Sequence, residues 1–308
     1  MVGKIGSWAL LGVVIIMAVY KYNDTFTIPG KVVVTFVSDI EEFPGNPLIK
    51  QDSTVWKCPP NITSVAYLVV GGGGGRGEPL RLPELYTELK CDGNYEGSMG
   101  PTSAGGGGAG DVKTGTFNTV PGRLYSIKVG LGGGVKVDGG LSSFHDIEAS
   151  GGFAGADGGY TDGGDSGSGK SGGEGVSGYF QSSPHLGGGG GAGAGEDGGN
   201  GVFQSGGDGG DGVPSDITGQ TVYYAGGGAG GGAYGVNNQD GSYCYVSNDG
   251  EHGLGTIGGG GDGTTYGLWE EGCGSNGIVI LQYDSPDEET PSILVMDLDI
   301  QTVDEMPP

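Results

Sequence analysis

The chain has 308 residues, of which 76 are glycine, and a formal net charge of −24. Binding to nucleic-acid phosphates needs clustered Lys and Arg, so this charge balance excludes a nucleic-acid partner. From Ser171 onward there are twenty acidic residues and no Lys or Arg. We interpret the acidic residues as part of a solvated, self-repelling surface that resists aggregation. Docking onto a basic partner or binding of divalent cations is the alternative.

The first predicted element is an apolar segment at 5–20, flanked by Lys4 and Lys21. As an α-helix it would span about 24 Å, slightly less than the ~30 Å of bilayer hydrocarbon. A cleaved signal peptide is the alternative, but no small-x-small cleavage site follows the segment. We therefore predict a membrane anchor at 1–22, whose membrane-facing residues are Trp8, Leu10, Leu11, Val13, Val14, Ile15, Ile16, Met17, Val19 and Tyr20.

A lead-in at 23–51 follows, with one strand predicted at 31–37. The glycine-rich domain then runs over 52–283 and contains further strand-like apolar runs at 65–70, 125–129 and 277–281. Within this domain the segment 78–103 has ordinary composition. Its leucines and Tyr86 recur at helical spacing, so we predict a short helical insertion there.

Glycine blocks such as 71–75, 105–108 and 187–191 dominate the domain. Glycine loses more backbone entropy on folding than other residues and brings no side chain to bury. Such a chain either stays disordered or packs backbone against backbone. The interrupting apolar runs and the fifteen tyrosines are foreign to flexible glycine linkers. We therefore predict extended helices with three residues per turn, stacked against one another.

The last predicted element is an acidic tail at 284–308 with one strand. Its alternating apolar residues predict a half-buried strand. That strand either pairs with a neighbouring sheet edge or folds back on its own domain, and the sequence leaves both open. The apolar residues are Leu294, Met296, Leu298 and Ile300.

Three segments of the domain resemble the glycine-rich domain family of phage tail-fibre adhesins and of bacterial and large-virus surface proteins. They are 53–65 leading through 67–70 into 71–75, then 120–130 with 139–144 and 149–152, and the closing strand 274–283. The resemblance covers about three quarters of the chain and implies a small β-framework that holds glycine helices. It implies adhesion, assembly or receptor interaction as roles rather than one activity. The anchor, the insertion and the acidic tail depart from the usual pattern of the family.

Several local motifs are formal matches to sites of known chemistry. Residues 164–171 fit the phosphate-loop pattern, but glycine-rich segments replace the strand and helix that such a loop needs. Asp208 and Asp211 fit one copy of a calcium-binding nonapeptide, for which tandem copies are required, so they are weak calcium candidates. None of the three histidines lies in a recognisable catalytic setting.

Four widely spaced cysteines give no zinc signature and allow up to two disulfides. Proximity along the chain favours Cys58–Cys91 and Cys244–Cys273 among the three possible pairings.

The expected fold is mainly β and irregular, a small β-framework with packed polyglycine II helices behind one transmembrane helix. We expect no enzymatic activity, cofactor or small-molecule substrate. The leading hypothesis is a membrane-anchored structural protein of a virion, with its capsid and internal membrane, or of a cell surface. It would be a minor capsid or coat component that contacts neighbouring coat proteins. The alternative is an adhesin or receptor-binding module. Candidate contact residues outside the tail are Tyr223, Tyr224 and Trp269.

Overall fold

The computed structural model describes residues 28, 30–38, 52–78, 103–156, 161–180, 183–203, 205–237, 243–247, 250–263 and 272–285. The described residues form β-strands, turns and extended segments, and no helix among them is long and apolar enough to cross a membrane. The predicted anchor at 1–22, nearly all of the predicted helical insertion and the predicted tail strand lie outside the described residues.

The first sheet has four antiparallel strands in the order β1-β14-β3-β4. They are β1 (Lys31–Phe36), β14 (Ile278–Asp284), β3 (Ser64–Val70) and β4 (Val112–Asn118). The predicted strands at 31–37, 65–70 and 277–281 are confirmed as β1, β3 and β14. The central strands β3 and β14 are buried on both faces, which explains their nearly continuous apolar sequences.

A second four-stranded antiparallel sheet packs on one face of the first. Its order is β2 (Asp52–Lys57), β5 (Leu124–Val129), β6 (Ser142–Phe144) and β7 (Ile147–Ala149), so the strand predicted at 125–129 is confirmed. Aromatic rings fill the space between the sheets. The Phe144 ring centroid lies 5.1 Å from that of Phe117 and 5.9 Å from that of Tyr125. The two sheets therefore form a sandwich with an aromatic core.

A hairpin covers the opposite face of the first sheet. It consists of β10 (Val213–Ser215) and β11 (Val222–Tyr224), and its Tyr224 is buried against Leu68, Val70 and Ile280. A side-chain hydrogen bond also joins the layers, since Gln282 Nε2 donates to the carbonyl oxygen of Ile217 at 2.8 Å. The first sheet is thus the middle of three layers.

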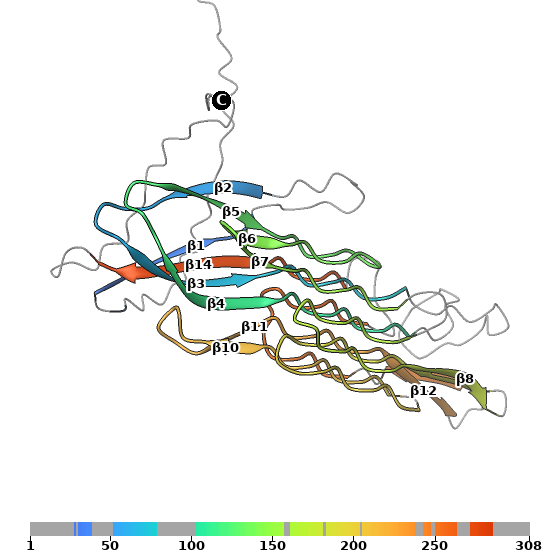
Figure 1. Cartoon of the computed structure of the whole chain (residues 1–308). Coiled ribbons are helices and arrows are strands. Elements are labelled where there is room, and N and C mark those ends of the chain that lie inside the picture. The colour runs from blue at the N-terminus through green and yellow to red at the C-terminus, as the bar shows by residue number, and fades with distance from the viewer. Residues whose placement is uncertain are drawn as a thin grey trace, which may run out of the picture.

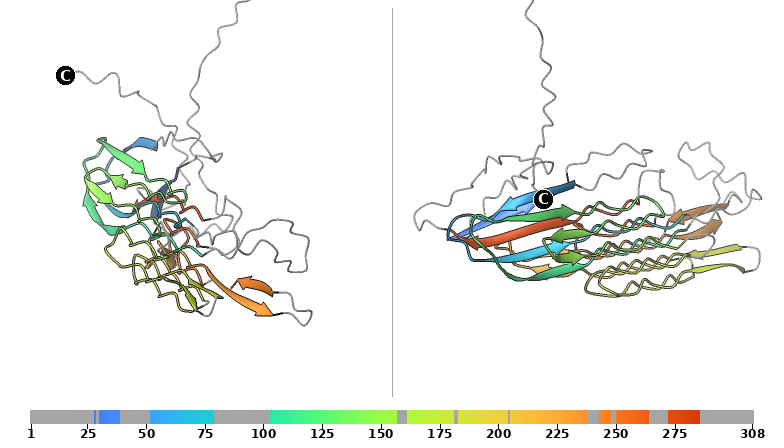
Figure 2. Two further views of the ribbon diagram at one scale, coloured as in Figure 1. Left: turned by 90° about the vertical axis from the view of Figure 1, so that its right-hand side faces the viewer. Right: turned by 45° about the horizontal axis from the view of Figure 1, so that its top comes forward.

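Extended glycine tracts continue several strands away from the sandwich and run side by side (Figure 1). They end near another four-stranded sheet, of order β13-β12-β9-β8, which Figure 2 shows at the far end of the tracts. Its strands are β8 (Val176–Phe180), β9 (Ser183–Gly187), β12 (Gly232–Asn237) and β13 (Tyr243–Ser247). We call this end the bundle tip.

The opposite end of the molecule is the sandwich end. β14 begins where the 272–277 tract finishes and runs away from the bundle, so Asp284, which lies opposite Lys31, marks this end. The backbone amide of Ser285 donates to the carbonyl oxygen of Gly30 at 2.8 Å. The chain segments before β1 and after β14 therefore both leave the described body at the sandwich end.

Candidate functional site

The glycine tracts bond laterally to one another through their backbones. Successive amides of the 71–77 tract donate in rotation to the 104–111 tract, the 137–141 tract and the 272–277 tract, with N···O distances of 2.8–3.0 Å. The donors to the 104–111 tract are Gly71, Gly74 and Gly77, which are three residues apart. Each amide therefore points to a different neighbour from the one before it, and the pattern repeats every third residue.

The 104–111 tract lies at the centre of this arrangement. Its amides donate to the 150–156, 187–195 and 258–263 tracts, and its carbonyls accept from the 71–77, 161–167 and 225–231 tracts. Three neighbours therefore serve as acceptors and three others as donors. Because backbone groups buried away from water must be paired, this lattice satisfies the main chain without any conventional sheet.

The lattice leaves no room for side chains at its interior glycine positions. A Cβ placed on Gly107 would lie 2.1 Å from the carbonyl oxygen of Gly74, and one on Gly190 would lie 1.9 Å from that of Asp208. The obstructing atoms are backbone atoms, which cannot rotate away. Only glycine permits main chains to approach so closely at these positions, as at the axis of collagen.

Carboxylate and amide side chains close the lattice where an outer tract lacks a carbonyl partner. In these hydrogen bonds a side-chain Oδ1 accepts from a backbone amide of the adjacent tract. The acceptor and donor residues are Asp162 and Gly175 (2.6 Å), Asp165 and Gly172 (2.9 Å), Asp197 and Ser171 (2.9 Å), Asn200 and Glu174 (2.8 Å), Asp208 and Glu251 (2.8 Å), and Asp211 and Leu254 (2.9 Å). Each acceptor pair within a tract is spaced by three residues, which matches the repeat of the lattice.

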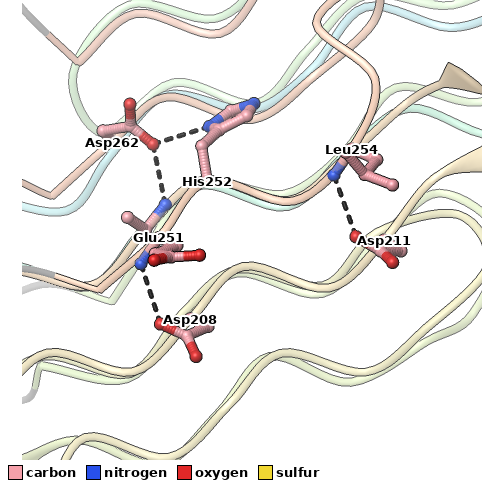
Figure 3. A network of polar contacts seen from close by, with 7 residues as sticks. Asp208, Asp211, Glu251, His252, Leu254 and Asp262 are labelled. Atoms are coloured by element: carbon pink, nitrogen blue, oxygen red, sulfur yellow. Dashed lines mark hydrogen bonds and ion pairs between the residues drawn. The ribbon is translucent and has the colours of Figure 1, made fainter.

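Asp208 and Asp211, the calcium candidates, belong to this edge (Figure 3). Within the described ranges, no group of three or more His, Cys, Asp or Glu residues is arranged to hold a metal ion. In the structure these two carboxylates accept hydrogen bonds from backbone amides of the 250–255 tract.

The same network contains a histidine–carboxylate contact between tracts (Figure 3). His252 Nδ1 lies 2.7 Å from Asp262 Oδ1, which also accepts the Ala229 amide at 2.7 Å. Partial burial alone would raise the pKa of Asp262. The hydrogen bond and charge of His252, with the Ala229 amide, outweigh burial and hold the pKa below its ordinary value. Asp262 thus fastens three tracts together in its ionised form.

The phosphate-loop match and the remaining histidines do not belong to this edge network. Residues 164–171 form a turn between two glycine tracts, in which the Ser166 amide donates to the Lys170 carbonyl at 2.9 Å and Gly169 has a φ of +83°. This geometry lacks the strand and helix of a phosphate loop. His145 stacks edge-on against Phe117 and Tyr125 at the sandwich. The side chain of His185 is not described.

The expected disulfides are not formed by the cysteines whose side chains the structure describes, because Cys58 and Cys273 are both free thiols. Cys58 is buried in the sandwich, and its Sγ donates to the carbonyl oxygen of Ile62 at 3.2 Å. Burial raises the pKa of the neighbouring Tyr283, and Cys58 adds to this effect. Of their expected partners, Cys91 lies outside the described residues, and the side chain of Cys244 is not among those described.

The predicted contact tyrosines do not form one surface. Tyr223 is 40% exposed on the hairpin, whereas Tyr224 is 2% exposed and packs in the layer beneath it, so its assignment as a contact residue is wrong. Trp269 lies outside the described residues, as do Leu294, Met296, Leu298 and Ile300. Alternation along β11 explains the difference, because successive side chains of a strand point to opposite faces.

These features define a class of protein in which laterally bonded main chains replace side-chain packing over much of the interior. The chain matches the family model of the glycine-rich domain over residues 50–284 and belongs to that family. No curated protein matches the chain in the sequence comparison.

Proposed function

We propose that the glycine tracts are polyglycine II helices and that the chain is a non-enzymatic, membrane-anchored structural protein of a virion or cell surface. In a virion it would be a minor capsid or coat component that tethers the coat to the membrane. The observation that carries this proposal is the lattice around the 104–111 tract, which is bonded to six neighbouring tracts. A repeat of three residues is that of an extended helix of the polyproline II type.

Stiffness follows from this construction. Bending the bundle would require neighbouring main chains to slide, and sliding breaks hydrogen bonds in every direction around each tract. Side-chain rotamers cannot absorb the movement, because the interior positions hold mostly glycine and alanine, which have no side-chain rotamers. A stiff body suits a spacer that keeps two attachment points at a fixed separation.

The molecule also has two distinct ends. Both flanking segments leave at the sandwich end, so a membrane anchor at 1–22 would attach there. The connections that follow Glu78, Ala156 and Gly263 leave from the other ends of their tracts. The proposed tether and the surface for neighbouring coat proteins are therefore separated by the length of the bundle.

Carbonate extraction of membranes from cells expressing the full chain tests the proposal. The wild-type chain should stay in the membrane pellet, and a Val14→Asp/Ile15→Asp variant should be released, because carboxylates are costly in a membrane-spanning helix. The matched control is Val120→Asp, which places a carboxylate at a valine that is 54% exposed on the sandwich. Release of the wild-type chain would refute membrane anchoring.

The alternative function, an adhesin or receptor-binding module, draws support from the same two-ended arrangement. Connections gathered at the bundle tip would face away from a membrane attached at the sandwich end. A Trp269→Ala variant should then lose binding to target cells, whereas Tyr223→Ala, on the hairpin beside the sandwich, should keep it. Retained binding by both variants would argue for the coat role.

A further inference from the structure

Strand β2 forms one edge of the second sheet, and β5 is its only sheet neighbour among the described strands. The Cys58 amide donates to the Arg123 carbonyl at 2.9 Å just beyond the paired residues. Since hydrogen-bonded positions alternate in an antiparallel pair, the amide of Trp56 also points toward β5. The amides of Val55 and Lys57 therefore point to the open edge.

The outer face beside this edge combines exposed apolar and basic side chains. Val55 is 37% exposed and Leu124 is 54% exposed, and Lys57, opposite Leu124, is exposed as well. The open edge of the first sheet, at β1, differs, because Lys31 there already forms an ion pair with Asp284 at 2.5 Å. An unpaired, partly apolar strand edge is a template for another strand.

The acidic tail begins close to this edge. Ser285 is bonded to Gly30 at the sandwich end, and Lys57 lies at the same end because it is opposite the first residue of β5. Phe36 of β1 and Trp56 of β2 share the aromatic core, so the two edge strands lie on facing sheets about 10 Å apart. The seven residues 286–292 reach at most about 25 Å, which is enough to pass from β1 to β2.

We propose that residues 293–300 of the same chain add to the open edge of β2 as an antiparallel strand. A segment that enters from the sandwich end runs toward the bundle, and β2 runs the opposite way. Pairing with β1 would be parallel, because β1 also runs toward the bundle. Alternation places Leu294, Met296, Leu298 and Ile300 on the core side, and Asp297 and Asp299 on the side of Lys57.

Amide hydrogen exchange measured by NMR on the full chain tests this pairing. In the wild type the amides of Val55 and Lys57 should be protected, as should the Trp56 amide, which faces β5. A Met296→Asp/Leu298→Asp variant should accelerate exchange of Val55 and Lys57 by about tenfold or more while leaving Trp56 unchanged. The matched control is Val295→Asp, a carboxylate on the opposite face of the same strand, which should change exchange by less than about threefold.

Two results would overturn the proposal. Unprotected Val55 and Lys57 amides in the wild type would show that nothing pairs with the edge. Protection that disappears on dilution, together with a dimer in light scattering, would assign the strand to a second copy instead. Near-ultraviolet circular dichroism of the buried aromatic cluster verifies that each variant keeps its sandwich.

Swapping the charges at positions 57 and 297 gives an independent test of the predicted pairing. Lys57→Glu should raise exchange at Val55 several-fold, because the introduced carboxylate would lie near Asp297. Adding Asp297→Lys should restore protection in the double variant. Failure of the second change to restore protection would place Asp297 away from Lys57 and refute the predicted face.

Discussion

Replacing Gly107 by alanine is the most direct test of the backbone lattice. Gly107 belongs to the central 104–111 tract, and its amide and carbonyl are bonded to Gly261 and Gly228 at 2.8 and 3.0 Å. The added Cβ would lie 2.1 Å from the Gly74 oxygen, whereas ordinary contacts begin near 3.4 Å. The two tracts must therefore separate by about 1.3 Å, the difference between these distances.

The expected cost follows from the bonds that such a separation breaks. The Gly74 amide donates to Gly108 at 2.8 Å, and Gly107 itself makes two more lattice bonds. Loss of two or three buried backbone hydrogen bonds, at 1–3 kcal/mol each, destabilises the fold by about 4 kcal/mol. For a body of this size that corresponds to a melting temperature lower by about 10 °C.

Thermal and urea unfolding of Gly107→Ala against Gly134→Ala measures this effect. A Cβ on Gly134 meets nothing within 4 Å, and its backbone is not in the left-handed region. The control should therefore be neutral, or more stable by about 0.4–1 kcal/mol through the unfolded state. Equal melting temperatures for the two variants would refute the claim that glycine is required for close backbone approach.

Three further predictions concern the edge and the core. Asp208→Ala should lower the free energy of unfolding by about 1 kcal/mol, because the Glu251 amide loses its acceptor. Asp208→Asn keeps an oxygen at that position and should have a free energy of unfolding near that of the wild type. Urea unfolding measures both variants, and a calcium chelator should not change either result. The folded-state pKa of Asp262 lies below its ordinary value of 3.8. The stabilisation that its ionised carboxylate gives the folded state is therefore complete above pH 3.8 and is lost as the pH falls through the lower folded-state pKa. The stability gap between wild type and Asp262→Asn should therefore close toward pH 2 in acid unfolding curves, and a gap independent of pH would refute the charge's role. Phe144→Ala should destabilise the sandwich by about 3–5 kcal/mol, since the ring is fully buried between both sheets, and a loss below 1 kcal/mol in urea unfolding would contradict that packing.

Apolar strands could be predicted because their side chains carry the packing information. The runs at β3 and β14 are buried on both faces and contain little glycine. β9 (Ser183–Gly187) and β12 (Gly232–Asn237) were missed, since glycine, proline and polar residues give them no alternating pattern. Both strands are held mainly by backbone pairing in hairpins, β9 with β8 and β12 with β13, which does not require an apolar side-chain pattern.

The acidic edge was missed although the sequence carries a signal for it. Asp208 and Asp211, like Asp162 and Asp165, are separated by two residues and lie in glycine-rich tracts. A repeat of three is the lattice repeat, so such pairs fall on one side of a tract and meet consecutive outward amides of the adjacent one. A single match to the calcium-binding nonapeptide in this segment made Asp208 and Asp211 weak calcium candidates instead.

The charge distribution and the lattice therefore have one physical explanation. At the edge of the glycine-tract lattice some backbone amides face no carbonyl, and a short acceptor side chain satisfies them without entering the interior. Aspartate supplies that acceptor while keeping its second oxygen available to water, so an outward-facing edge also becomes a charged, aggregation-resistant surface. Lysine and arginine have no acceptor atom and cannot take this role. Neither residue occurs from Ser171 onward, where much of the bundle is built.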